Sequence, residues 1–165
     1  MHREEAFLQA IGSVPEEIRQ SLMQLPPEVR QSCTEVRLRR ERPVTVQRNE
    51  RVQLLCPGGR LSDRQVPDNM IVSGVQIERM FQRLCAYSVH SYQSQIRAGY
   101  LTLPGGHRVG LCGRAVTENG QLQSVREISS LTVRISIPSS ALSMGASMIP
   151  LSHSGLPQTI AIYVF

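Results

Sequence analysis

Lysine is absent from this 165-residue chain, so all 18 of its basic residues are arginine. A phosphate-binding loop of the GxxxxGK[ST] type uses its lysine to reach the β and γ phosphates of a nucleoside triphosphate, while backbone N–H groups hold the same phosphates. No such motif occurs in these residues. We therefore expect no ATPase activity from the chain itself.

Aromatic residues and aspartates are also scarce. Only 4% of the residues are aromatic and none is tryptophan, which predicts a core built from aliphatic side chains. Asp63 and Asp68 are the only aspartates, and no G-x-S-x-G elbow is present. A serine hydrolase triad therefore has no support in the sequence.

The cysteines predict neither a metal site nor a redox motif. Cys33, Cys56, Cys85 and Cys112 form no CxxC pair and have no histidine at zinc-ligand spacing. We interpret them as reduced thiols of a cytoplasmic protein. The apolar run from Ile160 to Phe165 is far shorter than the ~20 residues that a membrane-spanning helix needs.

The net charge of +5 and the pI of about 9.5 permit an acidic partner, such as nucleic acid, an anionic membrane surface or an acidic protein. The net charge permits an acidic partner but does not imply one, because many arginines alternate with glutamates, as they do on ordinary solvated surfaces.

The N-terminal half predicts short helices followed by a strand meander. We expect a helix over residues 4–11 and a second helix that begins after Ser13, with Ser13 as its N-cap, and ends at Pro26-Pro27. Residues 34–39 alternate with a period of two, which predicts a half-buried strand. Residues 43–46 and 51–55 predict a hairpin.

From Ser73 the period changes to that of a helix. Ile77, Met80, Phe81 and Leu84 fall on one helical face. A second helix, over residues 89–96, is predicted to end at Gly99 as its C′ residue. Between Gly99 and residue 137, turn signals alternate with short strands, and Asn119-Gly120 is typical of a type I′ hairpin. The expected fold is α+β, a mostly antiparallel sheet with two to four helices.

The sequence of residues 105–135 is similar to that of a known family. It resembles the N-terminal domain of the stage III sporulation protein AA family, whose members carry a GGHR-hydrophobic-GLxGRAV segment, a short hairpin and an R-[DE]-ISSL-x-[IV]-R-I strand. The matching residues are Gly105, Gly106, His107, Arg108, Val109, Gly110, Leu111, Gly113, Arg114, Ala115, Val116, Arg126, Glu127, Ile128, Ser129, Ser130, Leu131, Val133, Arg134 and Ile135. Looser similarity begins at Glu35, with an EVRLR strand.

The resemblance implies the N-terminal domain of a secretion-ATPase-like protein. In the family this domain precedes a P-loop ATPase domain, which binds ATP and Mg²⁺, so no cofactor is expected in this chain. The implied role is assembly: orienting protomers by self-association and coupling them to sporulation membrane-complex proteins of the mother cell–forespore channel. The implied location is the cytoplasm, at the mother-cell face of the forespore membrane.

Composition places a boundary after residue 137. Residues 138–165 contain no Asp, Glu, Lys or Arg, and we expect them to form a divergent apolar tail or the start of the missing ATPase domain, beyond an N-terminal domain of residues 1–137. A truncated or frame-disrupted copy, an artificial boundary and a divergent ending all remain open. Residues 159–165 are typical of a strand, although we expect the tail to be poorly ordered or loosely packed.

The glycines of the GGHR block are expected to act structurally. Gly105, Gly106, Gly110 and Gly113 match neither the GxxxxGK[ST] nor the GxGxxG spacing, so a glycine-dependent hairpin is favoured over a phosphate loop. His107 has no second ligand nearby, which favours a turn-positioning or surface histidine over a metal ligand or a base.

The arginines of the same block are the candidate interaction site. Arg108, Arg114, Arg126 and Arg134 lie on neighbouring predicted strands and could form one basic face for phosphate or an acidic partner. The competing interpretation pairs them with Glu118, Glu127 and Glu35 on an ordinary surface. No catalytic, nucleotide-binding or metal-binding residue is expected.

Three functions remain open from the sequence: the assembly domain just described, an arginine-rich nucleic-acid-binding module, and a nonfunctional truncated copy that keeps its fold. The nucleic-acid module is disfavoured by the lack of lysine, by the few aromatics available for base stacking and by the absence of a known binding signature.

Overall fold

The computed structural model describes residues 3–136. Its helices are α1 (Arg3–Ala10), α2 (Glu16–Met23), α3 (Pro27–Ser32), α4 (Gly74–Leu84) and α5 (Gln93–Arg97), with 3₁₀ turns η1 (Ile11–Ser13), η2 (Pro57–Gly59), η3 (Val89–Tyr92) and η4 (Pro104–Gly106). Its strands are β1 (Cys33–Arg39), β2 (Arg42–Pro43), β3 (Thr45–Arg48), β4 (Arg51–Cys56), β5 (Arg60–Ser62), β6 (Ile71–Val72), β7 (Tyr100–Thr102), β8 (Arg108–Glu118) and β9 (Gln121–Arg134).

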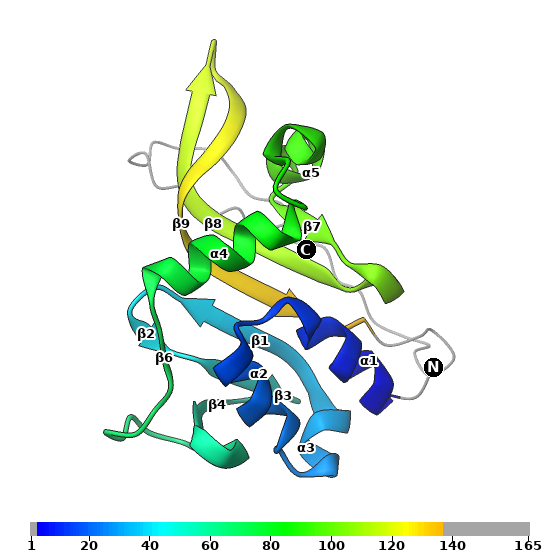
Figure 1. The fold of residues 1–165 in the computed structure, drawn as a ribbon, viewed down its shortest axis with the longest axis vertical. Coiled ribbons are helices and arrows are strands. Elements are labelled where there is room, and N and C mark those ends of the chain that lie inside the picture. Colours follow the sequence, from blue (N-terminus) through cyan, green and yellow to red (C-terminus); the bar gives the residue numbers. More distant parts are fainter. Residues whose placement is uncertain (1–2, 137–165) are drawn as a thin grey trace.

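The described strands form a seven-stranded antiparallel sheet in the order β5-β4-β3-β1-β9-β8-β7, and β2 pairs separately with β6. This topology confirms the predicted α+β fold with a mostly antiparallel sheet. Strand β9 joins the two halves of the chain, because it pairs with β1 on one side and with β8 on the other. Figure 1 shows α1, α2 and α4 on the near side of this sheet.

One face of the sheet carries the hydrophobic core. Val36 and Leu38 of β1, Val109 of β8, and Leu131 and Val133 of β9 are all fully buried. The helices pack against these side chains, and α4 does so through the face that the sequence predicted, with Ile77, Met80, Phe81 and Leu84 buried. An aliphatic core follows from the scarcity of aromatic residues.

Helix α4 begins where its sequence indicates. The Ser73 side chain accepts a hydrogen bond from the Gln76 N–H, and the Gln76 side chain accepts one from the Ser73 N–H, which together form a capping box. At the end of α5, Gly99 has a φ of +82° and follows the last helical turn, as predicted for a C′ residue. The Asn119-Gly120 turn has positive φ at both residues, as a type I′ hairpin requires.

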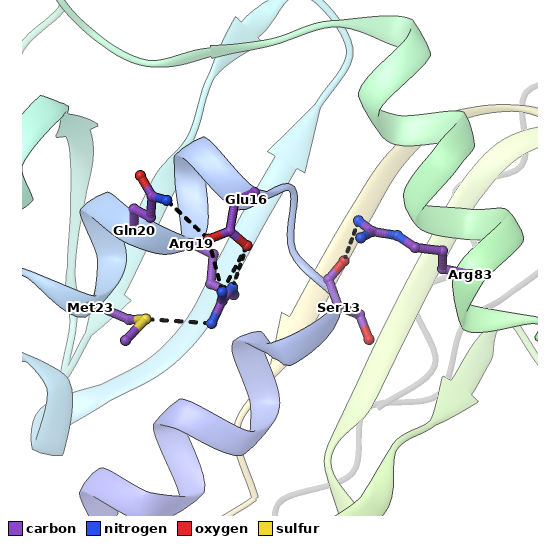
Figure 2. Close-up of polar contacts among 6 residues, drawn as sticks. All are labelled: Ser13, Glu16, Arg19, Gln20, Met23 and Arg83. Atoms are coloured by element: carbon purple, nitrogen blue, oxygen red, sulfur yellow. Dashed lines mark hydrogen bonds and ion pairs between the residues drawn. The ribbon is translucent and has the colours of Figure 1, made fainter.

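Two predictions about the helices were wrong. Ser13 does not cap α2, whose N-cap is Pro15 without a side-chain bond. Instead Ser13 closes η1, and its carbonyl accepts a hydrogen bond from Arg83 of α4 at 3.1 Å (Figure 2). Helix α2 ends at Met23, before Pro26-Pro27 as predicted, but Pro27 then occupies the first turn of a further helix, α3, where its missing N–H costs nothing. The described residues consequently hold five α-helices rather than two to four.

Surface contacts on α2 are local. Figure 2 shows Arg19 lying between Glu16 and Met23, with its closest nitrogen 2.7 Å from the Glu16 carboxylate and a second nitrogen 3.5 Å from the Met23 sulfur. The pair with Arg19 holds the pKa of Glu16 below its usual value. The Arg83–Ser13 bond shown beside them connects α4 to the N-terminal helices.

Two predicted features lie outside the described residues: the apolar tail of residues 138–165 and its strand over residues 159–165. The division at residue 137/138 remains a prediction.

Candidate functional site

The four candidate arginines occupy one face of the sheet. Arg108 of β8 pairs directly with Arg134 of β9, and Arg114 pairs directly with Arg126. Residues paired in this way project to the same side of a sheet. Burial alternates along β8, with Arg108 and Arg114 exposed and Val109 and Leu111 buried. The arginines therefore lie on the face opposite the core.

This outer face is defined here as the side of the sheet that carries Arg108, Arg114, Arg126 and Arg134. Helices α4 and α5 both contact β9, and Arg126 also borders the cavity between these helices and β9 that is described below. The neighbouring strand β1 adds Glu35 and Arg37 to the same face, because they pair with Arg134 and Thr132 of β9. An antiparallel sheet commonly has one such face turned away from its core.

Glu35 neutralises part of this charge. Its carboxylate lies 2.6 Å from Arg37 Nη2 and 3.3 Å from Arg134 Nε, and its side chain is only 11% exposed. The sequence anticipated a pairing with Glu35 but not its burial. Arg134 is consequently part of the structure of the sheet rather than an available cation.

Arg114 has a weaker partner. Its guanidinium lies 3.2 Å from the Glu127 carboxylate, and both side chains are more than half exposed. Exposed pairs of this kind contribute about 0–1 kcal/mol. Glu118, the third acid considered from the sequence, forms no ion pair within the described part of the chain.

Arg108 and Arg126 form no ion pair with the acidic side chains that the structure describes. The Arg108 guanidinium carbon lies 4.8 Å from the centre of the Tyr100 ring, a cation–π contact that leaves the nitrogen edges of the group exposed. Arg126 is exposed and, among residues 3–136, has neither an ion pair nor a side-chain hydrogen bond. Both groups can offer a planar fork of N–H donors to a carboxylate or a phosphate.

The four glycines divide into two pairs. Gly105 and Gly106 form the η4 turn with φ of +79° and +78°. Gly110 and Gly113, in contrast to the prediction of turn positions, lie inside β8. Gly113 faces a bulge of β9, and a Cβ there would lie 2.7 Å from the Arg126 carbonyl oxygen. Close approach of the two backbones explains this glycine, and a Cβ on Gly110 would meet only ordinary contacts.

His107 was expected to be either a turn-positioning or a surface histidine. It lies at the turn and not on the surface. Its ring is fully buried, and Nδ1 accepts a hydrogen bond from the Ser136 N–H at 3.0 Å. Burial lowers the pKa of the imidazole below its ordinary value. Within residues 3–136 no group of three or more His, Cys, Asp or Glu side chains is placed to bind a metal ion.

A cavity of about 360 Å³ lies between α4, η3, α5 and β9. Its apolar lining comes from Phe81, Val89, Val125 and Ile128, and its polar lining from Glu78, Gln82, His90, Gln93, Ser124, Arg126 and Glu127. Within this lining the Gln82 amide donates a hydrogen bond to the Glu78 carboxylate at 3.1 Å. This cavity could not be predicted from the sequence, because its walls come from segments far apart along the chain.

The cysteines are free thiols, and Cys33, Cys56 and Cys85 are buried. In the described range, no helix combines the length and the apolar character that crossing a bilayer demands.

Comparison with known proteins agrees with the family resemblance of residues 105–135. The family model described as "Sporulation stage III, protein AA" matches residues 3–150. The chain belongs to this family. A curated relative, "Stage III sporulation protein AA" of Bacillus subtilis (strain 168), is 32% identical over 122 residues, which cover 74% of this chain and 36% of the relative. No solved structure matches the chain.

This member of the stage III sporulation protein AA family thus spans about a third of the length of the relative that it matches. The family match extends past residue 137 to residue 150. Sequence reasoning found the arginines and the GGHR turn but missed three features of the site: the burial of Glu35, the stacking of Arg108 on Tyr100, and the bulge at Glu127. Tyr100 follows Gly99, the residue after α5, and pairs with Gly110 on the neighbouring strand β8. Arg108 lies two residues before Gly110 on the same face, so the register of the β7–β8 pair would have placed the ring beside it.

Proposed function

We propose that this chain is an N-terminal assembly domain of a stage III sporulation protein AA-like ATPase, related to secretion ATPases, and that it binds through its outer face. It contributes no ATPase activity, and ATP and Mg²⁺ belong to the domain that follows in the family. It acts at the mother cell–forespore channel during engulfment, on the cytoplasmic side. Its partners are other protomers and sporulation membrane-complex proteins.

The observation that carries this proposal is the direct opposition of like charges on the outer face. Arg108 faces Arg134 and Arg114 faces Arg126 across the same strand pair. Like charges placed directly opposite each other destabilise a sheet. Glu35 compensates the charge of Arg134, and Glu127 compensates that of Arg114. Arg108 and Arg126 have no acidic partner among residues 3–136. An anionic partner would relieve both.

Sedimentation velocity of the purified chain tests the proposal. We expect association that weakens between about 50 mM and about 500 mM salt, because exposed charges are screened at high ionic strength. The double variant R108E/R126E should sediment as a monomer at both concentrations. The matched control R42E/R79E changes the same number of charges at exposed arginines of β2 and α4, and it should associate like the wild type.

Two results would refute self-association through the outer face. One is a wild-type chain that stays monomeric at every concentration and salt. The other is a control variant that dissociates as fully as R108E/R126E, since net charge alone would then explain the effect.

Nucleic acid is the alternative partner that the arginines favour. Fluorescence anisotropy with a labelled single-stranded oligonucleotide separates the two functions. Assembly predicts no binding near physiological salt. Binding that falls steeply with added salt and depends on Arg108 and Arg114 would favour the nucleic-acid module instead.

A further inference from the structure

His107 connects two parts of the chain that are far apart in sequence. Its Nδ1 accepts the N–H of Ser136, which lies just beyond the end of β9, at 3.0 Å. The Ser136 hydroxyl in turn donates to the Gly106 carbonyl at 2.6 Å. The η4 turn, formed by Pro104–Gly106, is therefore bound to the point where the chain leaves the sheet.

The accepting role of Nδ1 determines the state of the ring. A neutral imidazole has one N–H and one acceptor nitrogen, so the proton lies on Nε2. Nε2 is buried and has no hydrogen-bond partner within residues 3–136. The surroundings leave little space: a Cβ on Gly105 would lie 2.9 Å from Nε2 and would clash with Gln9 Oε1 of α1.

We propose that His107 is a latch on the chain exit: the neutral ring holds the backbone at Ser136, and protonation of Nδ1 releases it. A protonated imidazole donates from both nitrogens, so Nδ1 would face the Ser136 N–H as one donor facing another. The hydrogen bond is then lost, and a charge is placed in a buried site.

The charged groups around the ring do not oppose this behaviour. From β8 and β9 the nearest charged side chains, Arg108 and Arg134, project to the outer face, where they contact Tyr100 and Glu35. From α1 the residue near the ring is the uncharged Gln9. The η4 turn contributes no charge, and burial is the cause that lowers the pKa of His107.

The consequence for pH follows from the sign of that shift. The folded chain binds the His107 proton less readily than the unfolded chain does, so the latch is fully formed above about pH 6.5, the ordinary histidine value. It weakens as the pH falls below that value toward the lowered pKa of the folded state.

Amide hydrogen exchange at Ser136, followed by NMR on the whole chain, tests the latch. Two neutral variants are matched: H107N places an oxygen near the position of Nδ1, whereas H107Q places its polar group near Nε2. At about pH 7.5 we expect Ser136 protection in the wild type and in H107N, and about tenfold less in H107Q, the loss of one hydrogen bond. As the pH is lowered stepwise below about 6.5, the wild type should lose protection while the chain is still folded, and H107N should keep it.

Internal amides separate the latch from general unfolding. Ile135 N–H donates to Thr34 O at 3.0 Å and Leu111 N–H to Gly99 O at 2.8 Å, and both should stay protected while Ser136 opens. Ser136 protection that is equal in all three proteins, or an acid loss that persists in H107N, would overturn the proposal. If H107Q does not fold, the contrast between wild type and H107N at the lower pH still decides.

Discussion

At the scale of single residues, the outer face combines groups of different character. Glu35 is nearly buried between two arginines, whereas Glu127 pairs with Arg114 where both are exposed. A nearly buried carboxylate leaves two cations unsatisfied when it is neutralised, and an exposed one leaves a cation in water. The two pairs on this face therefore differ in what they contribute to stability.

We expect Glu35→Gln to lower the free energy of unfolding by about 1–3 kcal/mol, the cost of leaving buried polar partners unsatisfied. The matched variant Glu127→Gln should change it by less than about 1 kcal/mol. Chemical denaturation at neutral pH measures both. Equal effects would show that Glu35 is no more important to the sheet than a surface acid.

Thiol reactivity reports the burial of the cysteines. Burial raises the pKa of Cys33 to about 12 and that of Cys85 to about 11, so neither presents a thiolate near neutral pH. Cys112 is only partly buried, on the outer face, and we expect it to react first with a thiol reagent. Rapid labelling of all cysteines in the folded chain would contradict the packing described.

The same thiols affect stability at alkaline pH. Because their pKa values are raised in the folded state, the unfolded chain loses these protons first as the pH passes the ordinary value of 9.0. Their contribution to stability is thus complete below about pH 9 and is lost as the pH rises toward the folded values.

At the scale of elements, the β8–β9 pair determines the site. Its arginines are aligned by register, and its irregularities lie opposite one another: Gly113 on β8 faces the bulge at Glu127, whose φ is +47°. Such bulges increase the local twist of a strand and redirect its side chains. The salt-bridged pair Arg114–Glu127 stands beside this bulge.

Gly113→Ala should destabilise the chain by about 1–3 kcal/mol, because the added methyl would meet backbone that cannot withdraw. Gly110→Ala is the control on the same strand. Its nearest contact would be Thr132 Cβ at 3.7 Å, so we expect no loss, or a gain of up to about 1 kcal/mol. Thermal denaturation of the two variants measures the difference, and a well-tolerated Gly113→Ala would disprove the close approach.

Local signals in the sequence predicted most of the elements. The period of residues 77–84 gave α4, Gly99 gave the end of α5, and Asn119-Gly120 gave the hairpin. The Ser13 cap was wrong, because Ser13 belongs to a 3₁₀ turn instead, and the additional helix that begins at Pro27 was not predicted. The site was harder to predict. The four arginines could be placed on neighbouring strands, but their alignment depends on two irregularities of β9, and the burial of Glu35 depends on three strands that meet only in the fold.

At the scale of the whole molecule, charge is distributed unevenly over the two layers. The core face of the sheet is covered by helices, and the outer face carries arginines from β1, β8 and β9. An exposed face with several cations of this kind can bind an anionic partner. The central claim is that this member of the family acts by association.

ATP hydrolysis by the purified 165-residue chain tests that claim most directly. We predict phosphate release in the presence of Mg²⁺ that equals the protein-free blank, since no lysine is present to reach the terminal phosphates. Turnover above the blank that a single substitution in this chain abolishes would contradict the account.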